Sequence, residues 1–268
     1  MDWKRFFDNL GLNGTRWQWR MMRWERNWQA LRRGEGLPAD FSLTRILIAV
    51  NVALFLAMIG QGILTGYGLS VLLNPPTELL YFAGAQYWPH AIDGQWWRCL
   101  TYAYTHGGLL HIGFNMMVLY QIGPLVEREI GTLRFFTLYT LTALTATIAG
   151  YLWHPMVPVV GASGALFGLI GFSAAYYHRV GPAGLYVRNI MLRWALFAFV
   201  FGLLVGADNA GHLGGAVGGA LIGALLPLGV RGRQVWRPLF NLLAAACAVM
   251  TLASLAALLY SWLAFWIS

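Results

Sequence analysis

Seven stretches of the chain are almost entirely apolar and long enough to cross a lipid bilayer, which takes about 20 mainly apolar residues in a helix. These stretches are residues 45–65, 107–126, 134–152, 161–178, 189–206, 212–230 and 240–267. The fourth and fifth, with 18 residues each, need flanking residues to complete a crossing. None alternates apolar and polar residues with period two, as a membrane β-barrel would. The pattern predicts an all-α fold, a polytopic transmembrane helical bundle.

Composition and charge agree with this interpretation and predict how the chain is oriented in the membrane. Hydrophobic residues make up 58% of the chain and charged residues 10%, against about 25% charged in soluble domains. Seventeen of the 18 lysines and arginines lie in the N-terminal region, at the edge of the first span, or in or beside every second connection between spans. Arg98 is the exception. Because such residues concentrate in cytoplasmic loops, we expect a cytoplasmic N-terminus and an outside C-terminus. The same bias explains the net charge of +8 without nucleic acid as a partner.

We expect three parts along the chain: a cytoplasmic region at residues 1–42, a six-helix core at 43–230 and a seventh helix at 231–268. The first part contains a basic, Trp-rich amphipathic helix. Its apolar stripe consists of Trp17, Met21, Trp24, Trp28 and Leu31. Such helices lie in membrane interfaces, although packing against another protein surface is an equal alternative. Residues 34–38, Gly-Glu-Gly-Leu-Pro, are expected to break the helix as a linker.

The connection at residues 66–106 is the longest in the chain, and we expect it on the outer side. It is aromatic and apolar, with few charges. A loop of this length is unusual unless it is functional. We therefore expect it to lie partly in the membrane.

Four polar side chains stand near the starts of the second, fourth and sixth spans. Polar groups in such positions are costly and are generally functional. They are His111 and Asn115, which share one helix face, then Ser163 and His212. All three spans run from outside to inside, so the four side chains would lie at comparable depth below the outer surface. The topology therefore predicts that they converge.

Glycines at helical spacing favour the same convergence. In the sixth span Gly211, Gly215, Gly219 and Gly223 recur every fourth residue, and Gly164 begins a similar series in the fourth span. Small residues at this spacing let helix backbones approach closely in lipid. We expect Gly164, Gly215 and Gly219 to pack the two spans together. Ser163 would then flank the contact face, about 100° around the helix from Gly164.

This group of residues suits nucleophilic catalysis. A serine hydroxyl attacks well only when a base removes its proton, and a neutral histidine can do so near pH 7. Because Asp208 lies in the loop before His212, we predict a Ser163–His212 dyad without a third acidic member. Asn115 could donate hydrogen bonds to an oxyanion, with His111 and the Ser163 backbone N–H as further donors. No cofactor or metal is expected, because no HExxH-like ligand pair occurs.

Taken one at a time, these motifs also have structural explanations. A GxSG sequence in a Gly-rich span often serves packing alone, and a single membrane histidine often only makes a structural hydrogen bond. We interpret His90, His106, His154 and His178 as such structural or interfacial residues.

Taken together, the motifs resemble those of the rhomboid proteases in order and spacing, over about residues 95–228. The matching motifs are Trp97-Arg98, His106, His111-Ile-Gly-Phe-Asn115, Gly161-Ala-Ser163-Gly164 and Ala210-Gly-His212-Leu-Gly-Gly. The resemblance implies a six-helix core, a Ser163–His212 dyad, oxyanion residues His111 and Asn115, and the six-plus-one subtype. Two positions depart from the family pattern: Glu129 replaces an arginine and Phe167 replaces a tyrosine that stacks on the histidine.

The function that this resemblance implies is intramembrane serine endopeptidase activity on single-pass transmembrane proteins, cut near the outer face. Its partners would be transmembrane substrates, entering between the second and fifth spans, and the lipid bilayer of a bacterial plasma (inner) membrane. A catalytically silent member that binds or retains transmembrane clients is the alternative. A transporter is less consistent, because transporters place ionisable residues near the midplane.

Overall fold

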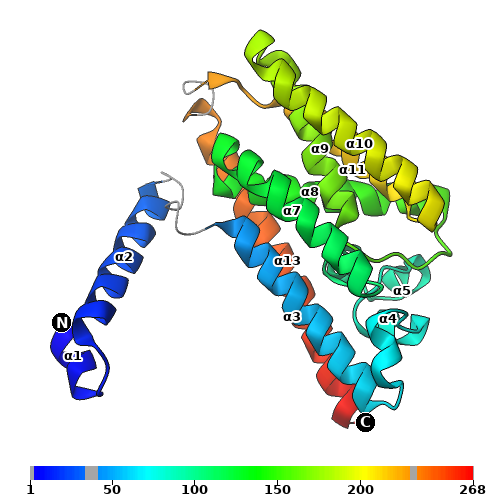
Figure 1. Ribbon diagram of the computed structural model, residues 1–268, viewed down its shortest axis with the longest axis horizontal. Helices are drawn as coiled ribbons and strands as arrows, with labels where there is room; N and C mark the ends of the chain where they lie inside the picture. The colour runs from blue at the N-terminus through cyan, green and yellow to red at the C-terminus, as the bar shows by residue number, and fades with distance from the viewer. Residues whose placement is uncertain (1–2, 34–41, 230–233, 268) are drawn as a thin grey trace. The chain divides into compact units, whose positions relative to one another are not determined.

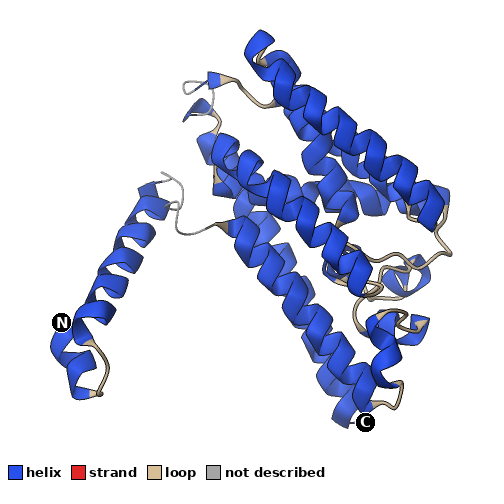
Figure 2. Ribbon diagram, in the orientation of Figure 1, coloured by secondary structure: helices blue, strands red, loops and turns tan. Residues whose placement is uncertain are grey.

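The computed structural model describes residues 3–33, 42–229 and 234–267, and these residues are helical apart from their connecting loops (Figure 2). The chain divides into two compact units, Met1–Ser42 and Leu43–Ser268. The division of the second unit at residue 230 stays a prediction.

The first unit is a pair of helices, α1 (Trp3–Asn9) and α2 (Gly14–Arg33). The Asp8 carboxylate accepts the Gly14 N–H at 2.8 Å, and the Phe7 and Trp17 rings stack at 5.0 Å. Trp17, the first member of the predicted stripe, thus packs on α1, while Trp24 is exposed.

Two parts of the N-terminal prediction go untested. The side chains of Trp28 and Leu31 lie outside the described residues, as does the linker predicted at residues 34–38.

The second unit contains a helix at each of the seven predicted spans. These are α3 (Leu43–Leu64), α7 (Leu109–Ile130), α8 (Thr132–Trp153), α9 (Ser163–Arg179), α10 (Leu185–Val205), α11 (Asn209–Leu225) and α13 (Arg237–Ile267). Among the described residues, five helices are long and apolar enough to cross a membrane: α3, α7, α8, α10 and α13. The chain is an integral, multi-pass membrane protein.

Helices α9 and α11 are shorter, with 17 residues each. At about 1.5 Å per residue they rise about 25 Å, against a hydrocarbon core of about 30 Å. The predicted sixth span runs to residue 230, whereas α11 ends at Leu225. The reason is local: Leu226 precedes Pro227 and adopts an extended conformation (φ −59°, ψ 126°), because a following proline disfavours helical geometry.

Helix α9 packs against α11, α10 and α8 with most of its residues buried (Figure 1). Helix α11 buries its glycine face and His212 and exposes leucines such as Leu213 and Leu225. Helix α11 packs most extensively on α9 and next on α8, and α10 packs on the other side of α9. Helix α3 packs on α7, and α13 packs on α8. Helix α10 is peripheral, since side chains such as Leu196 and Leu203 are 66% and 60% exposed within the protein.

Backbone contact between α9 and α11 depends on the predicted glycines. A Cβ added at Gly215 would overlap the carbonyl oxygen of Gly164, and one at Gly219 would overlap that of Gly168. Gly164 also faces α8, where an added Cβ would lie 2.6 Å from the Ala146 Cβ. Larger side chains on these faces would force the helices apart.

The connection between α3 and α7 folds into short helices instead of an irregular loop. They are η1 (Gly68–Leu72), α4 (Thr77–Phe82), α5 (Trp88–Ile92), α6 (Arg98–Thr101) and η2 (Tyr102–Tyr104). The buried Arg98 guanidinium joins them, because it donates to the carbonyl oxygens of Tyr81 (2.7 Å) and Ala85 (2.9 Å) and to Gln95 Oε1 (2.6 Å). The predicted position of this connection, partly in the membrane, stays a prediction.

Two glutamates near the end of α7, Glu127 and Glu129, make contacts to other helices. Glu127 caps the start of α3, accepting the N–H groups of Leu43 (2.7 Å) and Thr44 (3.1 Å). Glu129, which replaces the usual arginine, accepts the Tyr176 hydroxyl at 2.8 Å. In this chain the position therefore links α7 to α9 through a tyrosine.

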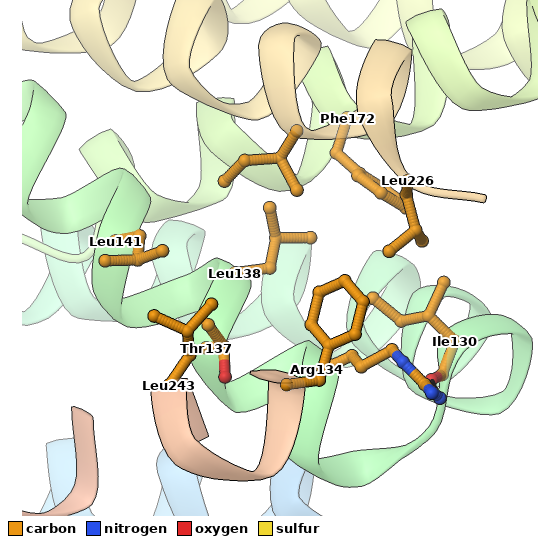
Figure 3. Close-up of a pocket in the computed structure, with 10 residues that line it drawn as sticks. Ile130, Arg134, Thr137, Leu138, Leu141, Phe172, Leu226 and Leu243 are labelled. Atoms are coloured by element: carbon orange, nitrogen blue, oxygen red, sulfur yellow. Dashed lines mark hydrogen bonds between the residues drawn. The ribbon is translucent and has the colours of Figure 1, made fainter. Parts of the chain in front are cut away.

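A cavity of about 90 Å³ lies between α8, α9, α11 and α13 and the last residue of α7, Ile130 (Figure 3). Its lining is apolar except for Thr137 and Arg134, whose guanidinium lies 5.0 Å from the centre of the Phe240 ring. The cavity adjoins Leu226, just past the end of α11, and so lies at the other end of this helix from His212.

Candidate active site

Ser163 and His212 lie within hydrogen-bond distance of each other. Ser163 is the first residue of α9 and His212 lies in the first turn of α11, so both stand at the starts of these paired helices. The distance from His212 Nε2 to Ser163 Oγ is 2.9 Å. The histidine is buried and the serine is half-buried. This is the geometry in which an imidazole can accept a hydroxyl proton.

The ring of His212 is held from two further sides. Phe167, one turn after Ser163, stacks on the imidazole with ring centres 4.3 Å apart and planes 15° apart. Asn209 Oδ1 lies 3.2 Å from His212 Nδ1. Gly202 on α10 makes room for both groups, since a Cβ there would lie 3.0 Å from Asn209 Oδ1 and 3.6 Å from His212 Cε1.

The contact with Asn209 has a chemical consequence. An amide oxygen only accepts hydrogen bonds, so Nδ1 of a neutral His212 must carry the hydrogen that Asn209 receives. Nε2 then presents its lone pair to the Ser163 hydroxyl, because a neutral imidazole has one donor and one acceptor nitrogen. Asn209 therefore favours the tautomer that can act as a base toward Ser163.

His111 and Asn115 of α7 converge on the backbone just before Ser163. A Cβ at Gly161 would lie 2.6 Å from His111 Nε2 and 3.8 Å from Asn115 Nδ2. Gly161 also has a φ of 116°, which only glycine adopts easily. Asn115 Nδ2 donates to the His111 carbonyl oxygen at 2.9 Å, which leaves the second amide hydrogen available.

His106 lies fully buried behind this group. Its ring meets the His111 ring edge-on at 5.3 Å, and its Nε2 lies 3.5 Å from the Ala162 backbone nitrogen. These contacts fit its interpretation as a structural residue.

The structure therefore brings all four predicted side chains together, from α7, α9 and α11. Asn209, which stands three residues before His212 in a helical segment, was not predicted as a site residue. That i, i+3 spacing was the available signal. Asp208 was predicted to be a plain loop residue, whereas it caps α11. Among the described residues, no group of three His, Cys, Asp or Glu side chains gathers to hold a metal ion.

Comparison with known proteins finds relatives that are named as rhomboid proteases. It is 34% identical over 177 residues to Rhomboid protease GluP of Bacillus subtilis, covering 65% of this chain but only 34% of that protein. It is 29% identical to Rhomboid-like protease 1 of Toxoplasma gondii, with coverage of 76% and 71%. Similarity to Rhomboid-like protease 3 of the same organism is 29%, with 82% of both chains covered. The profile of the Rhomboid domain matches residues 93–229, about half of the chain, so the chain belongs to the rhomboid family.

Proposed function

We propose that the chain is an intramembrane serine endopeptidase that uses Ser163 as nucleophile and His212 as base. The observation that carries this proposal is the 2.9 Å contact between His212 Nε2 and Ser163 Oγ at the starts of the paired helices α9 and α11. Family membership supports it, because the relatives compared above are named as proteases.

The reaction begins when Ser163 Oγ attacks the carbonyl carbon of the scissile peptide bond and His212 Nε2 takes the hydroxyl proton. The carbonyl oxygen becomes an oxyanion, to which Asn115 and His111 donate hydrogen bonds. His212 then passes its proton to the leaving nitrogen as the carbon–nitrogen bond breaks, and an acyl-enzyme remains. Water attacks this ester while His212 removes a water proton, and the departing Ser163 oxygen recovers a proton from His212.

The substrates would be single-pass transmembrane proteins, cut near the outer membrane face. A peptide bond inside an intact helix is inaccessible, so local unwinding of the substrate must precede attack. The substrate would enter between α7 and α10, where Phe114 of α7 meets Phe201 of α10 at 5.6 Å between ring centres. The exposed face and peripheral place of α10 support this route.

The proposed setting is a bacterial plasma (inner) membrane, with the N-terminus in the cytoplasm and the C-terminus outside. The asymmetry of lysine and arginine supports this orientation. Both reacting residues would then lie near the outer ends of their helices.

The test is labelling of the purified protein with a fluorophosphonate, which reacts with an activated serine. We expect labelling of the natural protein and none of the Ser163→Ala variant. Ser163→Ala and His212→Ala should each abolish cleavage of a model transmembrane substrate, at unchanged expression and folding. An unlabelled, inactive but folded natural protein would favour the catalytically silent alternative, a protein that binds or retains transmembrane clients.

A further inference from the structure

Asp208 closes the turn of α11 that carries His212. Its Oδ1 accepts the Gly211 N–H at 2.8 Å, and its backbone carbonyl oxygen accepts the His212 N–H at 3.0 Å. An aspartate at the cap position that bonds the third helical residue stabilises the first turn of a helix. Because Asn209 and His212 both lie in this turn, Asp208 determines where it begins.

The same carboxylate ties this turn to a distant part of the chain. Asp208 Oδ1 lies 2.7 Å from Nε2 of His154, the residue that follows α8. Gly211 makes room for the contact, whereas a Cβ at Gly150 would meet it only at ordinary van der Waals distance. A Cβ at Gly150 would lie 3.6 Å from His154 Cε1, and one at Gly211 would overlap Asp208 Oδ2. Both side chains are about one-fifth exposed, 22% for His154 and 18% for Asp208, so water screens the pair only in part.

The position of the pair matters because α11 follows the peripheral helix α10. Only a short turn joins the two, in which the Ala207 N–H donates to the Gly202 carbonyl oxygen at 2.8 Å. A displacement of α10 would therefore pull on the first turn of α11 directly. The contact with His154 anchors that turn to α8, a half-buried helix on the other side of α11.

From these contacts we infer that Asp208 and His154 form a positioning pair, which holds the first turn of α11 so that His212 stays within reach of Ser163. The inference rests on the proposed function of the Ser163–His212 contact. Neither side chain of the pair touches the reacting atoms. Their role is to keep a 2.9 Å hydrogen bond from lengthening, and misplacement by about 1 Å can cost about a hundredfold in rate.

The experiment compares Asp208→Ala, His154→Ala and the double variant in the full chain. Asp208→Asn is the conservative variant, because its amide oxygen can still accept from both Gly211 and His154. The matched control is His178→Ala, since His178 lies at the opposite end of α9 and contacts Arg188. The measurements are kcat and KM on a model transmembrane substrate, the rate of fluorophosphonate labelling, and the folded fraction.

We expect each alanine variant to lower kcat and the labelling rate about tenfold with unchanged KM, the loss seen when the hydrogen-bond partner of a metal-binding histidine is removed. The double variant should lose no more than the worse single variant, because the two residues act as one unit. Asp208→Asn should recover most of the rate, and His178→Ala should match the natural protein. Three results would each overturn the inference. Both alanine variants could react at the natural rate, the losses of the two single variants could multiply in the double variant, or the losses could disappear after correction for the folded fraction.

An NMR experiment tests the positioning role independently of proteolytic activity. The ¹⁵N resonances of the His212 ring, assigned with His212→Gln, should report a single tautomer in the natural protein and a mixture in Asp208→Ala. If the natural protein neither cleaves nor reacts with fluorophosphonate, the proposed function fails, yet the spectra still decide the positioning role. Unchanged His212 resonances in Asp208→Ala would refute it.

Discussion

Gly219→Ala is the most direct test of the backbone contact between α9 and α11. The added methyl group would overlap the Gly168 carbonyl oxygen and would lie 2.7 Å from the carbonyl carbon and 2.9 Å from the Cα of that residue. All three atoms belong to the backbone, so no side chain can rotate away. The helices must therefore separate, and dispersion contacts along the whole interface weaken with the gap.

The expected cost is about 3 kcal/mol, the upper part of the range for inserting a methyl group into a packed interior. It can be measured by titrating the purified protein in mild micelles with sodium dodecyl sulfate and following unfolding at equilibrium. Gly60→Ala is the matched control, because Gly60 lies within α3 and has no atom within 4 Å of the added Cβ. That exchange should be neutral, or stabilise by up to about 1 kcal/mol from helix propensity.

The reasoning would be refuted if Gly219→Ala and Gly60→Ala unfolded at the same detergent fraction. An equal result would mean that α9 and α11 can move apart without loss. A large loss in the Gly60 variant would instead show that the assay responds to any added methyl group.

Three further predictions concern catalysis and the N-terminal unit. Asn115→Ala should lower kcat by about 10²–10³, as removal of an oxyanion donor does, and a change in KM alone would make Asn115 a binding or packing residue. Proteolysis should persist in EDTA and 1,10-phenanthroline and should be lost with an isocoumarin that acylates serine; the reverse pattern would reject the serine mechanism. A peptide of residues 1–40 should bind anionic vesicles and gain helicity, because its arginines and tryptophans suit a membrane interface, and an unchanged circular dichroism spectrum would contradict this.

The spans were predictable because each is a local property of the chain. Apolar length alone placed α3 and α13 within three residues of their observed starts. The end of α11 was misjudged because apolar character continues past Leu226, while the backbone there responds to Pro227. Hydropathy does not register that local steric effect.

The pairing of Ser163 with His212, with Asn115, His111 and Phe167 beside it, was expected from topology and motif, but the contacts that fix the turn around His212 were not. The contact of His154 with Asp208 joins residues 54 positions apart, and it depends on where α8 ends and on Gly211, which leaves room for the Asp208 carboxylate. Arg98 likewise bonds carbonyl groups whose directions follow from the turns of the 66–106 connection. Such contacts depend on loop geometry, which no periodic pattern specifies.

The shortness of α9 and α11 bears on how water, the second substrate of hydrolysis, is supplied. These helices lack about 5 Å of the hydrocarbon thickness, and α9, which carries Ser163, is largely buried within the bundle, where lipid tails cannot fill the difference. If the missing length lies above Ser163 and His212, it forms a recess that opens toward the aqueous side. We therefore expect the acyl-enzyme to be hydrolysed by water that descends from the membrane surface, while the peptide chain arrives sideways through lipid, so that the two reactants never compete for one entrance.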